Sequence, residues 1–285
     1  MNQKRLVPLA SLTGGAVALI LRSWNLRAGF DPSGLPYRGH PSFSALLIFL
    51  ALLFVSLALS TLRFPADANP RFPFSAYGRP FRLLTVTGAF LLALSGAADF
   101  YESATGEHLF RRLQGASSVP YEYTGFIDGA DVGLSSGVQC AAGVMALLIA
   151  WSALECVRSC LNGKPLRFRT LVLIPPVALS FRLVVVYRMD SVNPVLQDYA
   201  PALVALILHT LAFYHFSAFA FDCGSLRKFA ASAGCASALS LCVLADGGDY
   251  VSTPLLLLGS AAVLTGFLFA ALESPAVKSA APPPA

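Results

Sequence analysis

The sequence predicts an all-α fold, a polytopic transmembrane helical bundle, and three features of the chain carry that prediction. Hydrophobic residues make up 56% of the 285 residues and charged residues only 12%, about half the charged share of an ordinary soluble domain. Apolar runs recur from one end of the chain to the other. Basic residues gather in short clusters between these runs, which is typical of membrane orientation signals. Because they follow no single face, we expect no nucleic-acid partner.

The apolar runs divide the chain into about eight spans within one integral membrane domain, residues 1–273. The first run follows Lys4 and Arg5 and has features of a secretory signal, but it continues past the small residues that mimic a cleavage site. We therefore predict an uncleaved first helix. Residues 274–285, rich in Ala and Pro, are predicted to be a disordered tail. The predicted spans are residues 6–24, 42–62, 83–98, 134–157, 170–187, 198–221, 229–245 and 253–272.

Prolines and glycines add local detail to three of these spans. Pro175 and Pro176 remove two backbone donors and should kink the fifth span. Pro201 suits the first turn of the sixth span. In the first span, Gly14 and Gly15 would let a neighbouring helix approach closely.

Two connecting segments stand out by composition. Residues 63–82 interleave arginines with aromatic residues and prolines. We therefore expect this segment to lie along the lipid headgroups, with its arginines on lipid phosphate and its rings at the interface. Residues 100–133 form the longest polar stretch, and a loop of that length in a compact bundle is usually functional or mobile.

The basic residues also predict the orientation of the bundle. With the amino terminus in the cytosol, about 13 of the 20 Lys and Arg residues fall on the cytosolic side and about six outside, while Arg182 lies within a span. Most acidic residues fall outside. We therefore expect both termini to be cytosolic.

Arg182 is the most prominent candidate for a binding residue. A charge within an apolar span is costly unless it meets water or a partner, so such a residue marks a functional site by default. Lying about five residues from the outer end of its helix, it could form a structural ion pair with Asp190, Asp198, Asp246 or Asp249. The alternative is a contact with an anionic ligand.

His209 is the second candidate, because its position eleven residues after Asp198 places it roughly 16 Å along the helix, near the bilayer midplane. That depth suits a proton relay or an ion site. His215 lies about 120° round the same helix, so the two imidazoles cannot share a metal unaided, whereas Tyr214 could extend a polar strip. The structural alternative is a histidine bonded to the backbone or a hydroxyl of a neighbouring helix.

The external loops hold one weak metal-binding pattern. Asp128 and Asp131, and likewise Asp246 and Asp249, lie in Gly-containing turns and offer oxygen ligands for Ca²⁺ or Mg²⁺. Asp-Gly is also ordinary turn chemistry.

The six cysteines form no C-x-x-C pair and predict no disulfide framework. Phosphate-loop, nucleophile-elbow and H-E-x-x-H motifs are absent, so we predict no cofactor and no catalytic residue, and favour a non-enzyme.

Three segments carry a resemblance to a protein family, namely residues 22–41, 187–199 and 213–221. Over much of its length the chain resembles a group of multi-pass membrane proteins of clostridial gut bacteria. That resemblance implies the cytoplasmic membrane of a bacterium as the location, and it implies no activity, because none is established for the group.

The leading functional hypothesis is binding, with movement, of a small molecule or ion. It rests on the number of spans, the kinked fifth span, His209 and Arg182. One alternative is a membrane sensor or an accessory subunit of a membrane complex, and another is an intramembrane enzyme that uses His209 or the external aspartates. The lipid bilayer is the one partner common to all three.

Overall fold

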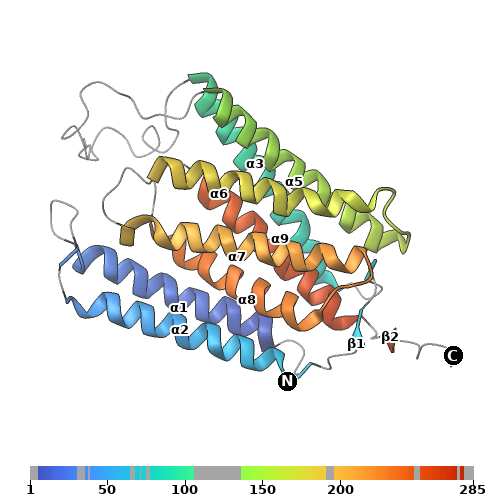
Figure 1. The fold of residues 1–285 in the computed structure, drawn as a ribbon, viewed down its shortest axis with the longest axis horizontal. Coiled ribbons are helices and arrows are strands. Elements are labelled where there is room, and N and C mark those ends of the chain that lie inside the picture. The colour runs from blue at the N-terminus through green and yellow to red at the C-terminus, as the bar shows by residue number, and fades with distance from the viewer. Residues whose placement is uncertain are drawn as a thin grey trace.

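In the computed structural model of the chain, the described residues form eight α-helices joined by turns and loops (Figure 1). The structure describes residues 6–30, 36–37, 39–64, 68–70, 72–74, 78–105, 136–190, 196–246, 251–274 and 277–278. The helices are α1 (Leu6–Ala28), α2 (Pro41–Thr61), α3 (Arg79–Thr105), α5 (Ser136–Asn162), α6 (Ile174–Asp190), α7 (Leu196–Ala220), α8 (Leu226–Val243) and α9 (Ser252–Glu273). The predicted all-α polytopic bundle is confirmed.

Seven helical segments within the described residues are long and apolar enough to cross a membrane, and α8 is not among them. The chain is therefore a multi-pass membrane protein. α8 has 18 residues, of which most are buried, including Phe229 and Leu239. Because α1, α7 and α9 pack around it, α8 needs less apolar surface than a helix that faces lipid.

Several helix boundaries differ from the predicted ones. α3 covers 27 residues, from Arg79 to Thr105, instead of 83–98, so Asp99 lies inside the helix. Pro175 and Pro176 lie in the first turn of α6, where their missing N–H groups are not needed, and a 3-10 helix, η2 (Arg169–Leu173), precedes them in place of a mid-helix kink. α7 begins two residues before Asp198, which places Pro201 inside the helix.

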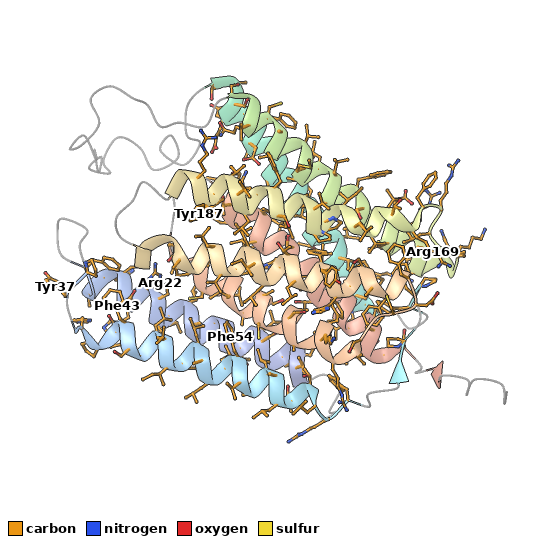
Figure 2. All side chains as sticks on the ribbon, viewed as in Figure 1. Arg22, Tyr37, Phe43, Phe54, Arg169 and Tyr187 are labelled. Atoms are coloured by element: carbon orange, nitrogen blue, oxygen red, sulfur yellow. The ribbon has the colours of Figure 1, made fainter. Side chains whose placement is uncertain are left out.

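Six helices form a closed ring in which each packs against the next, in the order α3, α5, α6, α7, α8, α9 and back to α3. α1 packs on α8, and α2 packs on α1 as the outermost helix (Figure 1). Figure 2 shows Arg22 and Tyr187 at one end of the bundle and Arg169 at the other. Following the predicted orientation, we call these the outer and inner ends. The start of α1 and the end of α9 both lie at the inner end (Figure 1).

Glycines set the closest helix contacts. A Cβ at Gly88 on α3 would lie 2.6 Å from the carbonyl oxygen of Gly259 on α9, so the two backbones touch. In the first span, a Cβ at Gly14 would meet Leu53 of α2 and one at Gly15 would meet Ala238 of α8. The close helix contacts predicted for Gly14 and Gly15 are confirmed.

The arginine-rich segment between α2 and α3 packs differently from its prediction. Phe74 is fully buried, and its ring lies 5.6 Å from that of Phe219 and 6.3 Å from that of Phe216, both on α7. Its ring therefore fills the inner end of the bundle instead of lying at the lipid interface. Nearby, β1 (Ala68–Asn69) pairs antiparallel with β2 (Val277–Lys278), which gives two residues of the predicted disordered tail a defined strand.

Candidate functional site

Arg182 lies buried between three helices of the ring, in the outer half of the bundle. Its Nη1 donates to both carboxylate oxygens of Asp99 on α3, at 3.0 and 3.1 Å. Its Nη2 donates to the hydroxyls of Ser252 and Thr253 at the start of α9, at 2.6 and 3.0 Å. Only 6% of Arg182 and 1% of Asp99 is exposed. We call these four residues the Arg182 cluster.

Asp99 is the partner that the sequence reading missed. The structural ion pair predicted for Arg182 exists, and Asp99 forms it. Of the four proposed external carboxylates, Asp246 pairs with Arg22 instead, and the side chains of Asp190, Asp198 and Asp249 lie outside the described residues. The predicted third span, residues 83–98, stops just before Asp99, because a charge usually closes an apolar run. In the structure α3 continues for six residues beyond Asp99, since the arginine neutralises its charge within the bundle.

A small cavity adjoins the cluster. It has a volume of about 10 Å³, and Asp99 and Arg182 line it together with apolar side chains of α5, α6 and α9 such as Met145, Ile149 and Leu256. That volume suits one water molecule. The Nε of Arg182 is buried and has no hydrogen-bond partner among the described residues. One N–H of the guanidinium is therefore uncommitted, and the cavity that Arg182 lines is otherwise apolar except for Asp99.

Polar groups continue along α3 on both sides of Asp99. One turn toward the outer end, Glu102 is 2% exposed and accepts a hydrogen bond of 2.9 Å from the side-chain amide of Gln139 on α5. One turn toward the inner end, the hydroxyl of Ser95 donates to the backbone carbonyl of Ser252, at 2.7 Å. Asp99 and Glu102 stand three residues apart, a spacing that places both carboxylates on one helix face. That spacing is the feature of the sequence that could have pointed to this site.

His209 is fully buried but does not join the Arg182 cluster. Its Nδ1 lies 2.7 Å from the carbonyl oxygen of Ala205, and its Nε2 lies 3.2 Å from the hydroxyl of Ser240 on α8. Because a carbonyl oxygen only accepts, Nδ1 carries a proton. The Ser240 hydroxyl has one proton and lies between two acceptors, Nε2 and the carbonyl oxygen of Ala236 at 2.8 Å. Both ring nitrogens therefore have a neighbouring polar atom within the protein. This geometry is the structural alternative given above for a midplane histidine.

Tyr214 and His215 lie away from both groups. Tyr214 is 59% exposed and His215 is partly exposed, and their rings lie 5.6 Å apart near the inner end of α7. Tyr214 is thus largely exposed, whereas His209 is fully buried. Asp198 belongs to α7, but its side chain lies outside the described residues.

Asp246 takes part in a second ion pair, which is partly buried. The guanidinium of Arg22, on α1, donates to its carboxylate and also to the side chain of Asn25, at 2.8 Å. Asn25 in turn donates to the hydroxyl of Ser42 on α2. Asp128, Asp131 and Asp249 lie outside the described residues. In the part of the chain that the structure describes, no group of three or more His, Cys, Asp or Glu side chains could hold a metal ion.

Comparison with known proteins adds nothing to this geometry, because no family model, no curated protein and no solved structure matches the chain. The Arg182 cluster and its cavity are therefore the candidate site on the basis of the fold and chemistry alone.

Proposed function

We propose that the protein binds a small ion at the Arg182 cluster and moves it across the membrane. The observation that carries this proposal is the Arg182–Asp99 pair, in which one guanidinium nitrogen donates to both carboxylate oxygens. The pair is buried within the spans beside a cavity of about 10 Å³, and one guanidinium N–H is uncommitted. Stability alone is a poor reason for such a pair, because apolar residues of similar volume often stabilise a protein equally well or better. An intramembrane ionisable residue is more often part of an ion or substrate path.

The chemistry of the pair favours a small anion that travels with a proton. Arg182 offers a planar set of donors that suits a carboxylate or another small oxyanion. An anion that enters from the outer end would take the place of Asp99 on Arg182, while Ser252 and Thr253 keep their hydrogen bonds to it. A buried carboxylate that loses its partner neutralises itself by taking a proton. The loaded site would then carry no more net charge than the empty one.

The size of the cavity limits the ligand. Its volume admits one water molecule, so a large organic substrate would require the helices of the ring to separate. A proton or a small anion requires much less movement. Glu102, with Gln139, lies one turn nearer the outer end and is the first polar group on a path from that side.

The test is a flux measurement in liposomes that contain the purified protein and an internal pH indicator. For at least one of chloride, nitrate, formate and acetate, an inward gradient should acidify the interior faster with the wild type than in liposomes without protein, which formic and acetic acid also enter as neutral acids. Asp99→Asn should abolish the anion-dependent proton signal, whereas Asp222→Asn, which alters an exposed carboxylate at the inner end, should retain it. Folded, inserted protein that moves neither protons nor any of these anions would refute the proposal.

A further inference from the structure

A second candidate site lies on the surface of α3, at the opposite end from the Arg182 cluster. A shallow groove of about 470 Å³ runs along the first two turns of the helix, and Arg79, Arg82, Leu83, Val86 and Thr87 line it. Two of these residues are basic and two are apolar. The groove therefore has a charged part near the start of α3 and an apolar part further along the helix.

The charged part suits a phosphate group. Arg79 and Arg82 stand three residues apart, so they share one face of the helix, and both are exposed. Each guanidinium can hold two oxygens of a phosphate with parallel N–H donors. The first turn of α3 also carries the positive end of the helix dipole. Glu273 brings one carboxylate close to Gly78, and the sum of these three side-chain charges is still positive.

The apolar part suits an acyl chain. Leu83 is 68% exposed and Val86 is 51% exposed, and Phe90, one turn further along, continues the stripe with 61% exposure. From Arg79 to Val86 the helix rises roughly 10 Å, which is the step from the headgroup layer into the hydrocarbon. A free phosphate ion would make no use of this apolar wall.

We infer that this groove binds an anionic phospholipid of the cytoplasmic leaflet, with its phosphate on Arg79 and Arg82 and an acyl chain along Leu83 and Val86. The predicted orientation places the inner end of α3 at that leaflet, where anionic lipids attract juxtamembrane arginines. The site is independent of the proposed ion transport, since it shares no residue with the Arg182 cluster.

Retention of phosphatidylglycerol tests the inference. The protein is reconstituted in nanodiscs of phosphatidylglycerol and phosphatidylcholine, extracted in mild detergent, and its bound lipids are counted by native mass spectrometry. The wild type should retain phosphatidylglycerol in preference to phosphatidylcholine. Arg79→Gln/Arg82→Gln should retain it about 30-fold less strongly, on the basis of the usual contribution of two basic residues at a membrane surface.

A matched control removes the same charge elsewhere at the inner end. Lys164→Gln/Arg167→Gln alters two exposed basic residues in the loop between α5 and η2 and should leave retention within a factor of two or so of the wild type, since neither residue lines the groove. Equal loss in both double variants would show a general charge effect and overturn the inference. Displacement of the lipid by millimolar inorganic phosphate would overturn it as well, because the site would then recognise the anion alone.

Discussion

Removal of Asp99 should destabilise the protein strongly, because Arg182 would stay buried without its counter-charge. In Asp99→Ala the guanidinium would keep only the hydroxyls of Ser252 and Thr253, and just 6% of the arginine is exposed. Breaking one partner of a buried ion pair costs about 3–5 kcal/mol. At about 2–4 °C per kcal/mol, this corresponds to a fall in melting temperature of roughly 6–20 °C.

The measurement is the thermal unfolding of the detergent-purified protein, with Asp222→Asn as the control, because Asn tolerates the left-handed backbone (φ 59°) at this position. Asp222 pairs with Arg169 at 3.8 Å, but the two side chains are 62% and 59% exposed, so its loss should cost no more than about 1 kcal/mol. The double variant Asp99→Leu/Arg182→Met should recover most of the loss, since it removes both charges and fills similar space. A single variant as stable as the control, or a double variant no better than the single one, would refute the reasoning.

Three further predictions concern the packing and the orientation of the bundle. Gly259→Ala should lower stability by about 1–3 kcal/mol, because the new Cβ would lie 2.8 Å from the carbonyl oxygen of Gly88 on α3. Phe74→Ala should cost about 3–5 kcal/mol, because its fully buried ring fills the inner end of the bundle. Cys223 is exposed at the inner end, so a membrane-impermeant thiol reagent should label it in inverted vesicles but not in intact cells.

Each of these predictions has a control in the same chain. Gly137→Ala on α5 should be nearly neutral, because a Cβ there meets nothing within 4 Å, and equal losses at Gly137 and Gly259 would contradict the α3–α9 contact. Phe90→Ala should have a small effect because that ring is 61% exposed. The labelling is best done in a Cys140→Ser background, since Cys140 is partly exposed near the outer end. Labelling of Cys223 in intact cells would reverse the predicted orientation.

Much of the fold could be predicted from the sequence because helices within a bilayer obey local rules. Each span satisfies its own backbone hydrogen bonds, so an apolar run of sufficient length is almost a complete description of the element. The eight helices lie where eight runs were expected, and Gly14 and Gly15 make the close contacts that small residues favour. The predicted boundary was wrong where a charge was expected to end a helix, as at Asp99.

The candidate site was only half predictable. Arg182 stands out in any reading, because a lone arginine in an apolar run requires a partner. The choice of Asp99 depends on the packing of α3 against α5 and α9, which brings together residues that are 83 positions apart. For His209, the sequence suggested a functional role that the observed hydrogen-bond partners do not require. Its depth suggested an ion path, but the close approach of α8 gives Nε2 a serine hydroxyl.

Composition and apolar periodicity by themselves determined that this chain is a multi-pass helical membrane protein, because lipid imposes that solution on any long apolar run. Only the tertiary structure decided which charges are paired and which rings are buried. Asp99 meets Arg182, Asp246 meets Arg22, and Phe74 enters the bundle, because each of these contacts depends on helices that are distant in sequence. Pairing across the ring is a property of three-dimensional packing, and no local pattern in the sequence encodes it.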